Sequence, residues 1–276
     1  VEIWYSRSIK FIALMALPIA VGGMLIAEPL VQALYTDEFL PALDPSRIGL
    51  FLLHTLNPWG MKHRRRTNAG NVDLNRNFLS QGTPFDPAVN PPYARLDPLL
   101  NPTGPVRSLA GSRLGFYTRL LGKVARLGPA AFREAALVGQ YRFPRGIHYG
   151  GEKMQEEART LSAILEAQLS LYSRALHLDV HTGYGPRLEM LVVTSEHEAR
   201  ASADLAHAFA YPAVVKATSS EFYRIQGDMI DFAYTLARER HPDKPFFAAS
   251  FEYGAIGESL AAEVLRLHIM VLAKQL

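Results

Sequence analysis

Short apolar segments alternate along this chain with longer segments of helical periodicity. Residues 48–54, 175–181 and 246–252 ("IGLFLLH", "ALHLDVH" and "FFAASFE") are apolar runs of strand length, and each ends on an ionisable residue. Apolar side chains recur at helical spacing over residues 154–172, and again over residues 259–271, which open with a serine suited to cap a helix. Strands interleaved with helices predict an α/β fold, with helices packed on a sheet.

The composition predicts a folded chain with one large core. Of 276 residues, 49% are hydrophobic and 20% are charged, which is ordinary for a globular domain. The net charge of +3 is mild, and the cationic side chains are scattered except at residues 62–66, so we expect no nucleic-acid partner. The chain has 0 cysteines, which excludes disulfides, thiolate zinc sites and cysteine nucleophiles.

An uncharged segment near the N-terminus suggests contact with a membrane. Residues 11–27, "FIALMALPIAVGGMLIA", approach the ~20 apolar residues that cross a bilayer, and Arg7 and Lys10 precede them. We expect a signal-anchor or a membrane span, with a buried core helix as the alternative. The protein is expected to be membrane-associated if this segment spans, and cytoplasmic otherwise.

The sequence "LDPSR" at residues 43–47 supplies turn-forming residues and marks a predicted domain boundary. Residues 1–42 are then an apolar helical segment, and this stretch, as far as "LVQALYTDEFLPA", resembles a fragment of a polysaccharide flippase. Residues 43–276 form the second domain, in which the proline-rich residues 80–105 are expected to be a long surface loop. Because the chain begins with Val1, we expect a fragment or a processed product.

Ionisable residues stand at the ends of all three predicted strands. In open α/β sheets, ligands bind beyond the carboxyl ends of the strands, where His54, His181 and Glu252 are expected to emerge. Taken singly, a histidine is more often structural than metal-binding, and a glutamate at a strand end is often a capping or salt-bridge partner. Their expected convergence is the first sign of a functional site.

The segment "NVDLNRNF", residues 71–78, places Arg76 between Asn75 and Asn77. A guanidinium flanked by carboxamides, with further arginines at residues 64–66, suits a carboxylate ligand because it offers parallel charge-assisted hydrogen bonds. The alternative is a solvated basic loop held by asparagine turns, and composition alone favours that alternative.

Five motifs together resemble a known family. "RTNAGNVDLNRNF", "DVHTGYG" and "SFEYG", in this order, are similar to segments of the zinc carboxypeptidases, and "VDLNRNF" is the most specific of them. "HTLNPWG" and "GQYRFPRGIHYGG" resemble a little-characterised bacterial branch. The resemblance runs from about Leu43 to the C-terminus. It implies a mixed, twisted sheet flanked by helices, and hydrolysis of a C-terminal peptide bond, or a related amide, at one zinc ion.

The resemblance also assigns roles to single residues. His181 matches the third zinc ligand of the family, and Glu252 matches the general base that takes a proton from zinc-bound water. The implied partner is a peptide or amide substrate with a free carboxylate.

Three further positions match residues that contact substrate in the family. Asn75 and Arg76 match the pair that binds the substrate carboxylate. Arg66 matches the arginine that stabilises the oxyanion, and Arg65 takes that place if the register shifts by one. Tyr223 matches a mobile tyrosine over the substrate, with an ordinary half-buried tyrosine as the alternative.

The chain departs from the family at the first two zinc ligands. The family supplies them from a His-x-x-Glu motif before "VDLNRNF", and none of the 9 histidines here has a glutamate three positions later. The fold is therefore expected to be N-terminally incomplete, with an apolar helix in place of the first metal-binding loop. His177 and Asp179 lie on the same strand face as His181, but alternate positions of a strand are about 7 Å apart. We therefore expect zinc to bind weakly or not at all.

Two functions are consistent with motifs that match the family and zinc ligands that are absent. The first is a metallocarboxypeptidase or amide hydrolase, impaired unless another segment supplies the absent ligands. The second is a catalytically inactive, membrane-tethered domain that binds carboxylate-terminated peptides without cutting them.

Overall fold

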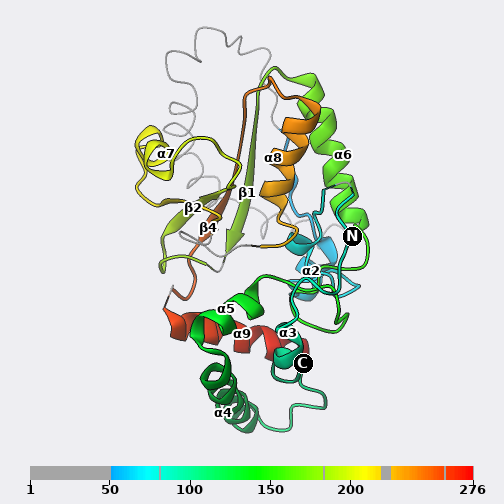
Figure 1. Ribbon diagram of the computed structural model, residues 1–276, viewed down its shortest axis with the longest axis vertical. Helices are drawn as coiled ribbons and strands as arrows, with labels where there is room; N and C mark the ends of the chain where they lie inside the picture. The colour runs from blue at the N-terminus through cyan, green and yellow to red at the C-terminus, as the bar shows by residue number, and fades with distance from the viewer. Residues whose placement is uncertain (1–50, 81, 183, 219–224, 258, 276) are drawn as a thin grey trace, which may run out of the picture. The chain divides into compact units, whose positions relative to one another are not determined.

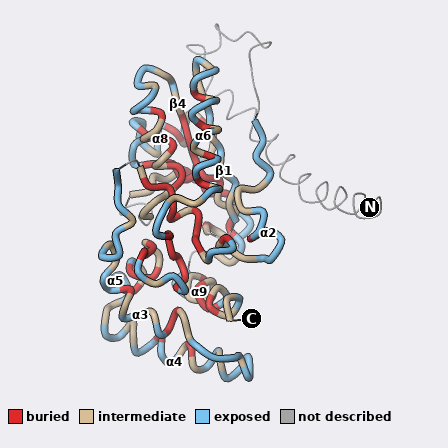
Figure 2. Tube along the Cα trace, turned by 90° about the vertical axis from the view of Figure 1, so that its right-hand side faces the viewer, coloured by how far each residue is buried: buried red, intermediate tan, exposed pale blue. Residues whose placement is uncertain are grey.

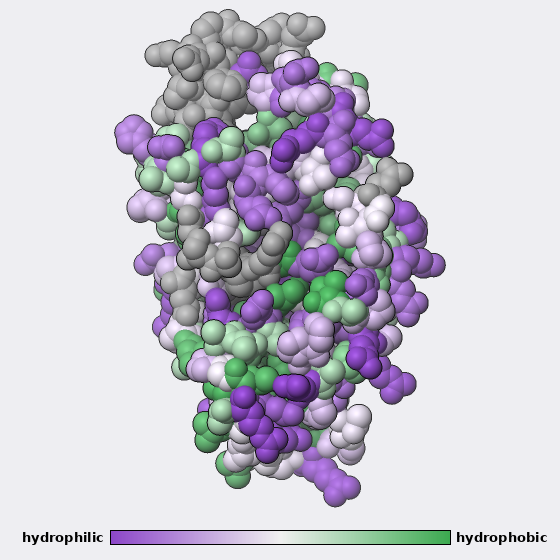
Figure 3. Space-filling view, in the orientation of Figure 1, coloured by the Kyte–Doolittle hydropathy of each residue, from purple (hydrophilic) through white to green (hydrophobic). Residues whose placement is uncertain are grey.

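The computed structural model describes residues 51–275, except residues 81, 183, 219–224 and 258. The predicted apolar segment at residues 11–27 lies outside the described residues, as does the whole predicted domain 1–42, so both stay predictions. Within the described part, no helix is long and apolar enough to cross a membrane. On the face drawn in Figure 3, hydrophobic residues form small groups among hydrophilic ones.

The chain divides into two compact units. The larger unit consists of Leu53–Ala199 and Val215–Leu276, and the smaller one of Val1–Leu52 and Arg200–Val214. In the described part of the smaller unit, the helix α7 (Ser202–Ala208) is followed by Ala210 in a left-handed conformation. All the residues discussed for the functional site belong to the larger unit.

A four-stranded mixed sheet holds the larger unit together, as the alternating pattern predicts. Its strands, in spatial order, are β1 (Ala175–Thr182), β4 (Phe246–Tyr253), β2 (Met190–Thr194) and β3 (Val214–Lys216). β1 runs parallel to β4, and β2 runs antiparallel to it. The two apolar runs at residues 175–181 and 246–252 are thus strands, and they are neighbours in the sheet.

Two helices lie side by side along the sheet, α6 (Glu156–Leu171) and α8 (Met229–Arg240), as Figure 1 shows. The helical spacing predicted for residues 154–172 is confirmed, because Leu161 and Leu165 of α6 are buried against α8 and β4. Figure 2 shows that β4 is buried along most of its length. The apolar stripe of α6 and the central strand therefore form one core.

A second core is made by four helices below the sheet in Figure 1. They are α3 (Tyr93–Leu100), α4 (Leu109–Leu127), α5 (Pro129–Leu137) and α9 (Leu260–Gln275). The predicted helix over residues 259–271 is confirmed as α9, and its serine cap is real, since the Ala262 amide donates to the Ser259 hydroxyl at 3.2 Å.

Two local predictions are wrong. Residues 80–105 are not a continuous surface loop, because they contain α3, whose Tyr93 and Leu96 are 0% exposed. Proline at residues 91 and 92 precedes the helix, where a missing N–H has no intrahelical partner to lose. Residues 51–54, the described end of the predicted first strand, form no strand and are exposed.

Candidate functional site

His181 and Glu252 lie side by side at the ends of two parallel strands. They are partners in the register of β1 and β4, and the His181 Nδ1 is 3.3 Å from the Glu252 Oε1. Parallel strands end at the same edge of a sheet, so the sequence prediction that these two residues meet is confirmed. Asp179 contacts the Nε2 of the same ring.

The two carboxylates govern the charge of His181. Burial lowers the pKa of the imidazole, but the hydrogen bonds with Asp179 and Glu252 outweigh burial and raise the pKa to about 10. The ring is therefore an imidazolium at neutral pH, with a carboxylate on each nitrogen.

Asn75 joins the "NVDLNRNF" segment to the start of α8. It lies in a short 3₁₀ helix, η3 (Leu74–Arg76), and its Nδ2 donates to the Asp228 carboxylate at 3.1 Å. Its Oδ1 accepts from the amide of Met229 at 3.0 Å. Asp228 in turn caps α8 by accepting from the amides of Ile230 and Asp231.

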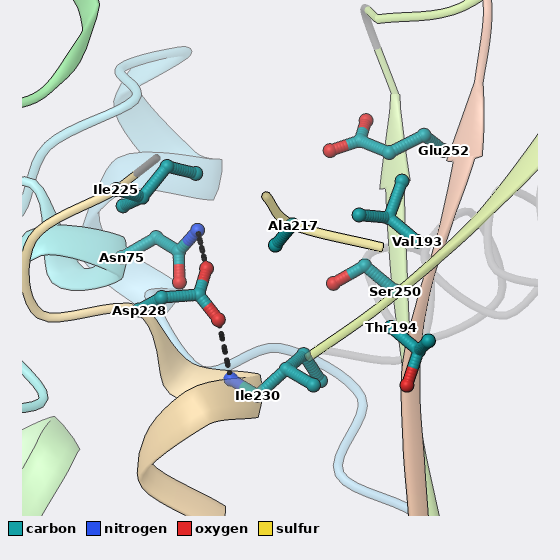
Figure 4. A pocket seen from close by; sticks show the side chains of 9 residues that line it. All are labelled: Asn75, Val193, Thr194, Ala217, Ile225, Asp228, Ile230, Ser250 and Glu252. Atoms are coloured by element: carbon teal, nitrogen blue, oxygen red, sulfur yellow. Dashed lines mark hydrogen bonds between the residues drawn. The ribbon is translucent and has the colours of Figure 1, made fainter. Parts of the chain in front are cut away.

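A small hollow of about 20 Å³, with room for about one water molecule, lies between the start of α8 and the sheet (Figure 4). Its polar lining residues are Asn75, Thr194, Asp228, Ser250 and Glu252. The remaining lining residues are Val193, Ala217, Ile225 and Ile230. We call this cavity the Asn75–Glu252 hollow. Of the predicted site residues, it brings Asn75 and Glu252 together, with His181 paired to Glu252.

Arg76 does not line the hollow. It is 1% exposed, and its guanidinium donates to the carbonyl of Asn75 at 2.9 Å and to that of Leu137 at 2.7 Å. Binding of a substrate carboxylate by Arg76 would require the guanidinium to leave both carbonyls.

Arg66 pairs with a buried carboxylate. Its Nε donates to the Asp73 Oδ2 at 2.8 Å, and the Nδ1 of His148 is 2.9 Å from the same oxygen. Burial would raise the pKa of Asp73, but Arg66, His148 and Arg76 together hold it well below its usual value. The Arg66 side chain remains 46% exposed.

The other predicted residues contribute nothing to the hollow. His54 is exposed and follows no strand. Tyr223 lies outside the described residues, so its predicted role is untested.

The residues that the structure describes do not fit a zinc ion by themselves. Among them, no group of three or more His, Cys, Asp or Glu side chains is arranged to hold a metal. A catalytic zinc site takes about three protein ligands, and a ligating imidazole presents a free ring nitrogen. Both nitrogens of His181 instead face carboxylates.

Sequence reasoning missed Asp228 and Ser250. Because Asp228 precedes a helical segment, the sequence indicates its role as a helix cap, but it does not indicate that Asp228 lines a cavity. Ser250 is a hydroxyl inside an apolar strand, two positions before Glu252 and on the same face. A serine two positions before the predicted general base was the sequence feature that could have indicated Ser250 as a site residue.

Comparison with known proteins places the chain in a family. A family model described as "Protein of unknown function (DUF2817)" matches residues 29–273. The chain belongs to this family. The match begins upstream of the boundary predicted at residues 43–47, and the comparisons give no support to the flippase resemblance.

One curated relative carries a functional name. "Carboxypeptidase SOL1" of Arabidopsis thaliana is 39% identical over 56 residues, which cover 20% of this chain and 11% of that protein. No solved structure gives a significant match. This partial similarity agrees with the carboxypeptidase resemblance at a coarse level.

Proposed function

We propose that this chain is a carboxypeptidase-like hydrolase domain that acts on C-terminal peptide bonds or related amide bonds. The observation that carries the proposal is the pairing of His181 with Glu252 at the rim of the sheet, beside the hollow that Asn75 lines. The segment shared with Carboxypeptidase SOL1 supports the same class of reaction.

Each residue has a defined part in this proposal. Glu252 accepts a proton from the attacking water, because its carboxylate lines the hollow, which has room for about one water molecule. His181 orients that carboxylate through the 3.3 Å contact. Asn75 contacts the substrate carboxylate, and the half-exposed Arg66 stabilises the oxyanion with its guanidinium plane fixed by Asp73.

Arg76 and zinc, both expected at the site from the sequence, do not contribute in the arrangement that the structure describes. Arg76 contacts substrate only after it leaves its two carbonyl partners. Zinc requires ligands from outside the described residues, because the described residues do not form a site. We therefore derive no catalytic step from a metal.

The test is hydrolysis of an N-acylated dipeptide with a free carboxylate, with zinc content measured on the same protein by mass spectrometry. We expect release of the C-terminal amino acid, no cleavage of the amidated dipeptide, and a loss of about a hundredfold or more in Glu252→Gln. Circular dichroism checks that the variant is folded. Wild-type protein that carries zinc and cleaves neither dipeptide would contradict the proposal, as would full activity in the variant.

A second candidate function is a domain that binds carboxylate-terminated peptides without cutting them, tethered to a membrane by residues 11–27. The observation that favours it is the occupation of both His181 nitrogens by carboxylates. Fluorescence anisotropy with a labelled peptide tests it. The free-carboxylate peptide should bind without being cleaved, and equal binding of the amidated peptide would reject this function.

A further inference from the structure

The four helices of the second core carry an excess of positive charge. Residues 91–137 and 260–275, which contain α3, α4, α5 and α9, hold nine Lys and Arg side chains and three Asp and Glu side chains. Their net charge of +6, with histidine neutral, exceeds the +3 of the whole chain, so the remainder of the chain is net acidic. Cations that are scattered in the sequence thus gather on one group of helices in the folded protein.

The helix α4 and the residues next to it carry most of this charge. Between Asp97 and Glu134 the chain has six cationic side chains and no acidic one. One of the six, Arg133, pairs with Glu263. The other five form no ion pair with a described residue, and they are Arg107, Arg113, Arg119, Lys123 and Arg126. Because neighbouring cations repel one another, an anionic partner would stabilise them.

The solvent side of α4 also exposes large apolar side chains. Phe116 and Leu120 of α4 are buried in the core of the four helices. Leu114 and Leu121 are instead 68% and 72% exposed, and Figure 2 shows the exposed outer side of this helix. They are seven residues apart, which is about two helical turns, so they form one ridge. This face is therefore apolar as well as cationic.

A second ridge on the same face consists of arginines. Arg119 and Arg126 are also seven residues apart and are exposed, and small residues such as Gly122 lie between the two ridges. The Arg119 Nε donates to the carbonyl of Gly115 at 2.9 Å, and the terminal nitrogens of this guanidinium bond no described residue. At the surface of an anionic bilayer, leucines can enter the boundary of the acyl chains while guanidinium groups bond phosphates.

Other partners match only one half of this face. Nucleic acid would neutralise the arginines but offers little apolar surface to the leucines, since protein–DNA interfaces are mostly polar. A second copy of the chain would cover the leucines but would bring a second set of cations against the first. A bilayer with anionic lipids takes both. In the part of the chain that the structure describes, no helix is long and apolar enough to cross a membrane, so α4 would lie in the plane of the interface.

We propose that the outer face of α4 docks on a membrane surface that contains anionic lipids, with Leu114 and Leu121 inserted and with Arg119 and Arg126 on the lipid phosphates. This contact is separate from the one expected for residues 11–27, and it does not rest on the proposed function. The core side of α4 stays packed, so docking requires no unfolding of the helix.

The test places a fluorophore at the proposed contact. The chain has 0 cysteines, so Thr118→Cys, at an exposed position of α4, is labelled at one site with an environment-sensitive dye. The same dye on Ser170→Cys, at an exposed position of α6, is the control. The full chain is mixed with vesicles of phosphatidylcholine, alone or with about 30% phosphatidylserine. This readout is local, so it reports contact by α4 whether or not another segment anchors the chain.

We expect the dye at position 118 to brighten and shift to the blue with the anionic vesicles only, and the dye at position 170 to stay unchanged. The response should disappear when the ionic strength is raised from about 0.05 M to about 0.5 M, because salt screens the attraction.

Two double variants separate the charge from the leucines. Arg119→Gln with Arg126→Gln should raise the lipid concentration at half-maximal response about fivefold for each cation removed. Leu114→Ser with Leu121→Ser should raise it about tenfold, by loss of the inserted apolar surface. Circular dichroism checks that both are folded.

Matched double variants elsewhere in the larger unit are the controls. Arg159→Gln with Arg187→Gln removes the same charge from exposed positions, and Leu171→Ser with Leu188→Ser removes leucines that are 73% and 87% exposed. Both should respond as the protein without these substitutions does.

No response at position 118 with anionic vesicles overturns the proposal, as does an equal response with neutral ones. An unchanged response in either α4 double variant rejects this face as the contact. A response at position 118 to duplex DNA at lower concentration than to vesicles assigns the face to nucleic acid. A dimer that the leucine variant loses, measured by sedimentation equilibrium, assigns it to a second copy, and both results overturn the membrane contact.

Discussion

Asn75 and Arg76 are consecutive in the chain, yet their side chains serve different parts of the molecule. The Asn75 carboxamide bonds the start of α8 and lines the hollow, whereas the Arg76 guanidinium is buried against the carbonyl of Leu137. Asn77, the next carboxamide, is 0% exposed and donates to the carbonyls of Gly150 and Lys153. The alternation of amides and arginine thus ties one segment to three others.

Replacement of Arg76 by methionine should destabilise the fold. The variant leaves the partly buried carbonyls of Asn75 and Leu137 without these donors, at a cost of about 2–4 kcal/mol in the free energy of unfolding. Arg187→Met, at an exposed position, is the matched control and should stay within about 0.5 kcal/mol of the wild type. Urea denaturation measures both. A variant as stable as the control would show that Arg76 is not structural.

Asn77→Asp should be strongly destabilising although it is nearly isosteric. The Asn77 Nδ2 donates at 2.7 Å to the Gly150 carbonyl, and a carboxylate there faces acceptors in a buried site. We expect a loss of about 3 kcal/mol or more, measured by thermal unfolding. Asn71→Asp, where the side chain also bonds carbonyls but is only partly buried, should lose less. The reverse order of the two variants would contradict the assigned contacts.

Gly227 should not tolerate a side chain. Its φ is +73°, and an added Cβ would meet the backbone carbonyl of Arg76. Gly104 has a φ of +103° but no atom near such a Cβ, so Gly104→Ala isolates the backbone strain. We expect Gly104→Ala to lose about 1 kcal/mol and Gly227→Ala clearly more, by chemical denaturation. Equal losses of unfolding free energy in the two variants would show that the close approach of Gly227 to the Arg76 carbonyl is not the cause.

His148 should make stability depend on pH. Burial lowers the pKa of its imidazole to about 4 from the ordinary value of 6.5. Between these values the unfolded chain binds this proton and the folded chain does not, so stability falls as the pH drops through this window.

The expected size of this effect is about 3 kcal/mol, from about 1.4 kcal/mol for each unit of pKa shift. Urea midpoints measured between pH 4 and 7 should therefore fall less steeply in His148→Gln, which retains an N–H donor for Asp73. His54→Gln, at an exposed position, should follow the wild-type curve. Plots of urea midpoint against pH that run parallel for His148→Gln and the wild type would contradict the prediction.

Much of the fold was predictable because its signals are local. The apolar runs that became β1 and β4, and the apolar stripes of α6 and α9, depend on residues a few positions apart. The prediction failed at α3, where prolines masked a buried helix, and at residues 51–54, where an apolar run formed no strand. Apolarity alone does not supply a strand with a neighbour to pair with.

The candidate site, like the fold, has one part that the sequence indicates and another that only the tertiary structure decides. The sequence by itself determined that His181 and Glu252 end strands. The structure showed that these strands are parallel neighbours, which brings the two side chains together. Only the tertiary structure decided that Arg76 turns to a carbonyl 61 positions away, and that Asp228 and Ser250 face one hollow. Secondary structure follows from short-range periodicity. The direction of a polar side chain follows from whichever distant partner the packed chain presents to it.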